Sequence, residues 1–253
     1  MSDVRDSVRL TVAELRKGGS VLGRHTNIIS SWQVVMVMLQ LRQLVVQPGQ
    51  RIQLQDVVWS EFEAILDELG DKRACRIAYS DGILEIRMPS PKHEKAKVLI
   101  GDRVKILLEE LDLDNECFGS STFKRQDMAK GIEPDDCFYI ENSARMIGKD
   151  RIDLIVDPPP DLAIEVDVTS KTGLDTYQSL GVPELWQFEN GNLRISMLQN
   201  GQYHNVNFSP HFPNLPIIDG VSQFIERSQT EGRSQTLKAF RQWAQQLIQR
   251  KTL

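Results

Sequence analysis

The spacing of apolar residues along the chain predicts four helices. The first covers about residues 60–69, with Ser60 as its N-cap and Gly70 at its end. The second begins after Pro91 and carries a long apolar stripe, made of Ile100, Val104, Leu107, Leu108 and Leu111. A short helix is expected over about residues 172–180. The last helix is C-terminal and has one apolar face, made of Leu237, Phe240, Ala244, Leu247 and Ile248.

Runs of β-favouring residues between turn dipeptides predict the strands. Asp81-Gly82 predicts a hairpin within residues 76–88. After the long helix come strand candidates at residues 116–124, 137–141, 162–168 and 185–188, and the short helix separates the last two. Further Asn-Gly dipeptides predict an antiparallel tail of strands to about residue 208. The order helix, strand, strand, strand, helix, strand predicts an α/β (α+β) fold, with a central sheet covered by helices on both faces.

The same patterns divide the chain into three parts. Residues 1–48 show no amphipathic period of useful length, so we expect a loosely ordered extension there. Met36 and Met38 lie near its end, and translation from either one is a hypothesis. Residues 49–228 hold the predicted sheet and its helices. Residues 229–253 are expected to form an amphipathic helix packed on that domain.

Composition and charge narrow the class of protein. With 253 residues and 40% hydrophobic content, the chain can bury a sizeable core. Its 30 basic and 35 acidic residues give a net charge of −5, which excludes a globally basic nucleic-acid coat protein and leaves phosphate binding to a local patch. The three cysteines form no CxxC pair, so we expect neither disulfides nor a zinc–cysteine site, and a cytoplasmic protein. The most apolar run, residues 32–46, is too short to span a membrane.

The segment DLAIEVDV, residues 161–168, is the most informative part of the chain. Its apolar residues alternate along one strand face, so Glu165 and Asp167 are expected together on the other face, about 6.5–7 Å apart. Neighbouring carboxylates repel each other in a sheet, unless their face is exposed or a cation lies between them. Lys171 follows just past this strand. An acidic strand edge that faces solvent is the alternative interpretation.

A second acidic motif opens the preceding strand. In IEPDD, residues 132–136, Asp135 and Asp136 are expected on opposite faces of that strand. Alone, Pro-Asp equally marks a turn. Together with Glu165 and Lys171, however, Asp135 completes a set suited to Mg²⁺, which binds one or two carboxylates along with water and phosphate oxygens. Such a set of groups can hydrolyse a phosphodiester bond.

Four stretches in this order carry a resemblance to a known family: SDGILEIRMPSPKHE, GIEPDDCFYIEN, PPPDLAIEVDVTSK and YQSLGVPELWQFE. The chain resembles the PD-(D/E)XK restriction-endonuclease-like superfamily and, within it, the Uma-type family of bacterial restriction endonucleases. The resemblance covers roughly residues 46–253. It implies a restriction-endonuclease-like core, endonuclease activity on DNA with Mg²⁺ or Mn²⁺ as cofactor, and a homodimer that cuts both strands.

The resemblance also implies roles for individual residues. The family's metal-binding Asp falls on Asp135, and its strand Glu falls on Glu165. Asp167 stands where the motif's Lys would be. Many members of the family place this Lys four residues before a helix Tyr, which matches Tyr177 here, but that position holds Gly173.

We therefore expect Lys171 to take the role of the catalytic Lys, with Asp167 as an extra ligand of the metal or of water. His93 and Glu94 begin the long helix, where the family often has a His. They either contribute to the metal shell or form an exposed pair at the start of the helix.

Basic residues cluster in three places, and a solvated face explains each cluster by default. They are Lys92, Lys95, Lys97, Arg103 and Lys105; then Lys124, Arg125 and Lys130; then Arg233, Lys238, Arg241, Arg250 and Lys251. If the protein binds DNA, these groups are the expected phosphate contacts.

Three other functions stand beside a DNA endonuclease. A catalytically silent member of the same fold would bind nucleic acid or protein without turnover, and the displaced Lys and acidic net charge favour it. A nuclease acting on RNA or structured DNA would use the same site. A serine or cysteine hydrolase is disfavoured, because the chain has no GxSxG motif and only four His.

Overall fold

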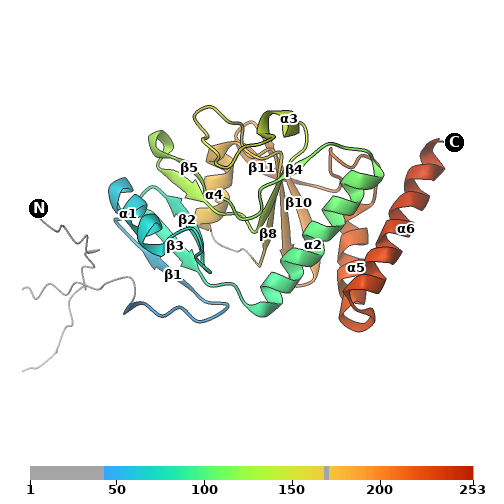
Figure 1. Ribbon diagram of the computed structural model, residues 1–253, viewed down its shortest axis with the longest axis horizontal. Coiled ribbons are helices and arrows are strands. Elements are labelled where there is room, and N and C mark those ends of the chain that lie inside the picture. Colours follow the sequence, from blue (N-terminus) through green and yellow to red (C-terminus); the bar gives the residue numbers. More distant parts are fainter. Residues whose placement is uncertain (1–42, 168–170, 253) are drawn as a thin grey trace, which may run out of the picture.

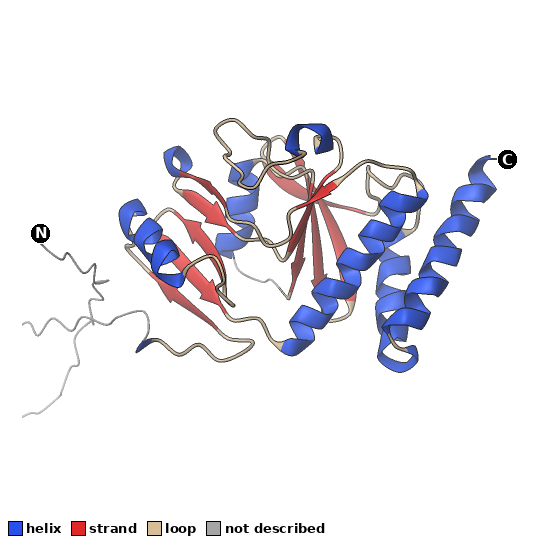
Figure 2. Ribbon diagram, viewed as in Figure 1, coloured by secondary structure: helices blue, strands red, loops and turns tan. Residues whose placement is uncertain are grey.

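The computed structural model of the chain describes residues 43–167 and 171–252, and its strands form two sheets (Figures 1 and 2). The smaller sheet has the strand order β1-β3-β2-β6-β5, and all its pairs are antiparallel. Its strands are β1 (Arg51–Leu54), β2 (Arg76–Ser80), β3 (Ile83–Arg87), β5 (Phe123–Arg125) and β6 (Lys130–Ile132). The β2–β3 turn is the Asp81-Gly82 hairpin predicted from sequence, with φ angles of 48° and 86°.

The larger sheet has the strand order β11-β10-β9-β8-β7-β4, and only its β8–β9 pair is parallel. Its strands are β4 (Glu116–Cys117), β7 (Asp136–Tyr139), β8 (Leu162–Val166), β9 (Glu184–Glu189), β10 (Asn192–Gln199) and β11 (Gln202–Val206). Helix α4 makes the crossover between the two parallel strands, as such a connection requires.

Helices α2, α5 and α6 cover one face of the larger sheet, and α4 covers the other. The helices are α1 (Trp59–Leu69), α2 (Pro91–Glu110), α3 (Ser143–Met146), α4 (Lys171–Leu180), α5 (Ile217–Glu231) and α6 (Arg233–Thr252), with a short 3₁₀ helix, η2 (Gln126–Met128). Figure 1 shows α2, α5 and α6 side by side at one end of the molecule, and α1 on the smaller sheet at the other end. None of the helices within the described ranges is long and apolar enough to cross a bilayer.

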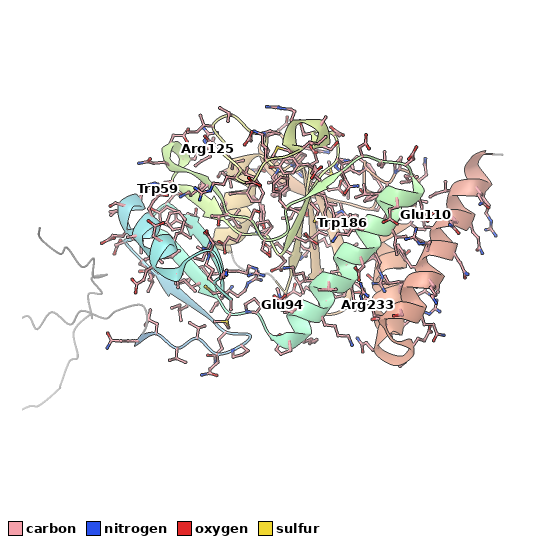
Figure 3. All side chains as sticks on the ribbon, viewed as in Figure 1. Trp59, Glu94, Glu110, Arg125, Trp186 and Arg233 are labelled. Atoms are coloured by element: carbon pink, nitrogen blue, oxygen red, sulfur yellow. The ribbon has the colours of Figure 1, made fainter. Side chains whose placement is uncertain are left out.

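Strand β8 separates two apolar clusters. Leu162, Ile164 and Val166 pack with α2, α5 and α6, whereas Ala163 packs with α4 and with residues of β5 and β6. The side of β8 that carries Ala163 and Glu165 therefore faces α4 and the smaller sheet. In Figure 3, Trp186 lies within the larger sheet, where it is fully buried. The alternation predicted for residues 162–168 is confirmed as far as Val166, where β8 ends, and Val168 lies outside the described residues.

The mixed α/β fold is also confirmed. So is its core order along the chain: α2, then strands β4, β7 and β8 of the larger sheet, then α4, then strand β9 of the same sheet. The expectation of one central sheet is incomplete, because the strand candidate at 116–124 is divided. β4 pairs with β7, whereas β5 pairs with β6 in the smaller sheet. Gly119 lies between them with φ of 57°, a conformation that turns the chain and favours glycine.

Two further details differ from the sequence analysis. Helix α1 begins one residue before Ser60, and its N-cap is Val58, whose N–H donates to the Glu61 carboxylate at 3.0 Å. Ser60 is therefore inside the helix. The sequence analysis also missed α5, which runs across the domain limit expected at residue 228. Most of the expected extension, residues 1–42, lies outside the described residues.

Candidate active site

Asp135 and Glu165 meet at the end of two neighbouring strands. Because β7 and β8 are antiparallel, with Asp136 opposite Ile164, Asp135 lies beside the C-terminal end of β8. The Asp135 N–H donates to the carbonyl of Ile164 at 3.1 Å. Asp135 is fully buried and Glu165 is 3% exposed. The two carboxylates that were predicted from separate motifs are therefore brought together.

Arg87, at the end of β3, joins both carboxylates. Its Nη2 donates to Asp135 Oδ1 at 3.1 Å and to Glu165 Oε2 at 3.2 Å. Its Nη1 donates to the carbonyl of Val166 at 3.1 Å. The site thus lies between the two sheets, and the smaller sheet supplies its positive charge. Sequence reasoning missed Arg87, because a single Arg at the end of a hairpin strand carries no motif.

His93 reaches the same place from the first turn of α2. Its Nε2 lies 2.9 Å from Asp135 Oδ2, an oxygen that also accepts from the N–H of Val166 at 2.8 Å. The hydroxyl of Ser90 caps this helix by accepting from the His93 N–H. Glu94, labelled in Figure 3 at the start of α2, is half-buried, and its Oε1 lies 3.7 Å both from Arg76 Nη2 and from Nδ1 of His93.

Helix α4 closes the site from the other side. The hydroxyl of Tyr177 donates to Glu165 Oε1, and both side chains are buried. A small cavity of about 20 Å³ borders Glu165, Arg87 and Gly173. That volume holds about one water molecule. Gly173, the position at which the family pattern often places its Lys, therefore does lie beside the paired carboxylates.

Asp167 and Lys171 were predicted to complete the site. Strand β8 ends at Val166, and Asp167 has a left-handed backbone with φ of 52°. Its N–H donates to the carbonyl of Phe188 at 2.8 Å, and its side chain is exposed. The prediction that Asp167 shares a strand face with Glu165 is therefore wrong, because the alternation stops one residue earlier. Lys171 begins α4, and its side chain lies outside the described part of the chain.

Comparison with the sequence models of protein families assigns the chain to a family. Residues 59–226 match the model of the Uma2 family, whose description reads "Putative restriction endonuclease". The chain belongs to the Uma2 family. The resemblance found in the sequence is thereby confirmed.

One solved structure similar to this Uma2 protein comes from Anabaena variabilis, and its title describes a "putative nuclease belonging to DUF820". The two chains are 17% identical, with a TM-score of 0.46, over 66% of this chain and 97% of the other. Comparison with curated proteins gives no match.

The environment of the Uma2 site shifts the pKa values of its two carboxyl groups in opposite directions. Burial favours the neutral form of Asp135, but the hydrogen bond to His93 and the charge of Arg87 outweigh it and lower the pKa of Asp135. Burial, together with the charge of Asp135, raises the pKa of Glu165 to about 8. Burial would also lower the pKa of Arg87, but the two carboxylates raise it, so the guanidinium stays charged.

Several of the basic residues expected to contact phosphates are engaged within this Uma2 protein. Arg103 is fully buried and donates to the carbonyls of Leu99 and Phe224, at 2.6 and 2.7 Å. Lys130 is buried and donates to Ser80 at 2.6 Å. Neither group is available to DNA. Others are paired with acids: Lys124 with Glu63, Arg125 with Asp127, Arg233 with Asp102, and Arg241 with Glu109 and Glu110.

A groove of about 870 Å³ lies between the first half of α2, the β9–β10 turn and α5. Lys92 and Lys95 are exposed along its α2 side, and Glu226 lies on its α5 side. Its floor is apolar and includes Leu99, Phe188 and Ile225. These floor residues belong to the apolar cluster on the Leu162, Ile164 and Val166 side of β8, whereas Glu165 lies on the other side of that strand. The groove and the site share the start of α2, because Lys92 directly precedes His93.

Proposed function

We propose that this Uma2 protein is an endonuclease that hydrolyses phosphodiester bonds in DNA, with Mg²⁺ or Mn²⁺ held by Asp135 and Glu165. One observation carries the proposal. Two buried carboxylate oxygens, one from each residue, converge on a single cationic nitrogen of Arg87. Membership in a family described as restriction endonucleases supports the nuclease class.

The residues fit a divalent cation of this kind. Asp135 Oδ1 and Glu165 Oε2 lie 3.1 and 3.2 Å from one nitrogen, so one positive centre can contact both oxygens. Mg²⁺ commonly takes one or two carboxylates and fills its other positions with water and substrate phosphate oxygens. The described residues hold no cluster of three or more His, Cys, Asp or Glu that would form a metal cage. Water molecules and the phosphate oxygens of the substrate would therefore fill the remaining coordination positions.

The reaction adds the oxygen of a water molecule to phosphorus and breaks one phosphorus–oxygen ester bond, while a proton passes from the water to a base and the leaving oxygen gains a proton. A bound cation supplies positive charge to the phosphate and lowers the pKa of water. In this chain, His93 orients Asp135, and Tyr177 orients Glu165. Lys171 and Asp167 are proposed to assist the attacking water from the segment that follows β8.

The groove between α2, the β9–β10 turn and α5 supports a nucleic-acid substrate. Lys92 and Lys95 would contact phosphates along one side, and the exposed turn between β9 and β10 would border the strand at its end. A local basic edge on an acidic protein is the arrangement that the composition requires for phosphate binding.

The direct test is cleavage of supercoiled plasmid with Mg²⁺ or Mn²⁺, by wild type, Asp135→Asn and Glu165→Gln. Asp136→Asn is the matched control, since Asp136 is the next residue, also buried, and faces Gly101 on α2. We expect cutting by wild type and by the control, and a loss of at least about a hundredfold in both site variants. Circular dichroism and melting curves check that each variant is folded.

Equal cutting by wild type and Asp135→Asn would overturn the assignment of the site. If wild type binds DNA but cuts neither DNA nor RNA, the protein is a catalytically silent binding module and not an enzyme. If the protein cuts RNA but not DNA, the proposed substrate changes to RNA and the assignment of the site stands. The ratio of nicked to linear plasmid further tests the implied homodimer, because two paired sites cut both strands in one encounter.

A further inference from the structure

Arg87 lies at the position between Asp135 and Glu165 that the proposed cation would take. We infer that Arg87 is a positioning residue, which holds the two carboxylates in place until a divalent cation binds and then leaves that position. The inference rests on the proposed function, since it concerns the same pair of carboxylates.

The hydrogen bonds at the site support this role. All four carboxylate oxygens already accept protein donors: Oδ1 and Oδ2 of Asp135 from Arg87, His93 and the Val166 N–H, and the two oxygens of Glu165 from Arg87 and Tyr177. Among the donors that the described residues provide in these contacts, Arg87 is the one shared by both carboxylates. Removal of its guanidinium frees one oxygen on each carboxylate and leaves the other donors in place.

The distances place the cation and the guanidinium in competition. Magnesium binds oxygen at about 2.0–2.1 Å, and Arg87 Nη2 lies 3.1 and 3.2 Å from the two oxygens concerned. A cation bonded to both oxygens would therefore lie close to the guanidinium, and the two positive groups would repel each other. Either the cation or Arg87 bridges the carboxylates.

Burial indicates which group moves. The Arg87 side chain is 16% exposed, whereas the Asp135 and Glu165 side chains are 0% and 4% exposed. Beyond the two carboxylates, the guanidinium is held by one hydrogen bond, to the carbonyl of Val166. Arg87 is also the last residue of β3, so its side chain borders the cavity beside Gly173 and can leave without disturbing the sheet.

The test is calorimetric titration of cation-free protein with MnCl₂, for wild type, Arg87→Gln, Arg87→Lys and Arg51→Gln. Arg51 is the control, since it pairs with Arg87 across β1 and β3 but contacts Glu85, at 3.8 Å. We expect Arg87→Gln to bind Mn²⁺ roughly tenfold more tightly than wild type, because one competing charge is gone. Arg87→Lys, with a single ammonium, should be intermediate, and Arg51→Gln should match wild type.

Melting curves supply a second measurement. Without cations, Arg87→Gln removes the positive charge that the buried Asp135–Glu165 pair shares, so it should melt below wild type, and MnCl₂ should raise its melting temperature by more than that of wild type. The rise in melting temperature with MnCl₂ can also be measured for a variant that folds poorly in chelator. A purely structural role for Arg87 predicts the reverse, weaker Mn²⁺ binding in Arg87→Gln.

The inference would be overturned if Arg87→Gln and Arg87→Lys bind Mn²⁺ no more tightly than wild type does. It would also be overturned if none of these proteins binds Mn²⁺. That outcome is separable from failure of the proposed function. If wild type cuts DNA and Asp135→Asn does not, only the role of Arg87 is lost. If Arg87→Gln binds Mn²⁺ more tightly but no protein cuts nucleic acid, the role of Arg87 holds and the endonuclease is lost.

Discussion

The hydroxyl of Tyr177 donates a hydrogen bond to the carboxyl group of Glu165, which ties α4 to β8 inside the site. Both residues are almost fully buried, and Asp135 lies beside them. Burial raises the pKa of Glu165 to about 8 and that of Tyr177 well above its ordinary value. Of the two carboxyl groups, Glu165 is therefore the one that takes up a proton more readily, and Asp135 is the one that keeps its negative charge.

This arrangement predicts how stability depends on pH. The folded protein binds the Glu165 proton more tightly than the unfolded chain, whose Glu has an ordinary pKa of 4.5, so the free energy of unfolding falls as pH rises from 4.5 to about 8. Glu165→Gln cannot lose a proton, so it should melt several degrees above wild type at pH 9 and close to it at pH 4.5, in chelator. The control is Glu68→Gln, an exposed position on α1. An unchanged pH dependence in Glu165→Gln would contradict the assignment.

Arg103 provides a prediction about stability. Its guanidinium joins α2 to α5 through two backbone carbonyls, and its central carbon lies 5.7 Å from the centre of the Phe240 ring on α6. Burial lowers the pKa of Arg103 to about 10. We expect Arg103→Ala to lower the free energy of unfolding by about 3 kcal/mol in urea, from lost packing and lost hydrogen bonds.

Two further variants separate the causes of that loss. Arg103→Met keeps most of the apolar volume and should lose less than Arg103→Ala. Lys105→Ala, at an exposed position on the same helix, should change stability by less than about 0.5 kcal/mol. If Arg103→Ala and Lys105→Ala were equally mild, Arg103 would not hold the three helices together.

The sequence predicts the local parts of this fold well. The Asp81-Gly82 hairpin and the alternation of β8 follow from the nearest neighbours in the chain, and both are present. The division into two sheets does not follow from local pattern. It depends on β6 pairing with β2, far earlier in the chain, and on the turn at Gly119. Long-range pairing of this kind leaves no periodic trace in a single sequence.

The candidate site divides in the same way. Asp135 and Glu165 lie in recognisable motifs, and the structure brings them together. Arg87 comes from a different sheet, and only the folded chain reveals its position. Asp167 was misplaced, because the two-residue period was extended past the end of β8. The catalytic roles of these residues, and of Lys171, stay predictions that the plasmid assay tests.

The groove between α2, the β9–β10 turn and α5 makes a prediction about DNA binding. If Lys92 and Lys95 contact phosphates there, the double variant Lys92→Gln/Lys95→Gln should bind a short DNA duplex more weakly, and the salt dependence of log K should lose about two units of slope. Fluorescence anisotropy over a range of KCl concentrations, in Ca²⁺ or chelator to prevent cutting, measures both quantities. The matched control is Lys72→Gln/Lys238→Gln, which removes the same charge from exposed positions outside the groove lining. A general electrostatic attraction would lower the slope equally in both double variants, whereas a bound strand in the groove requires the loss to be confined to Lys92 and Lys95.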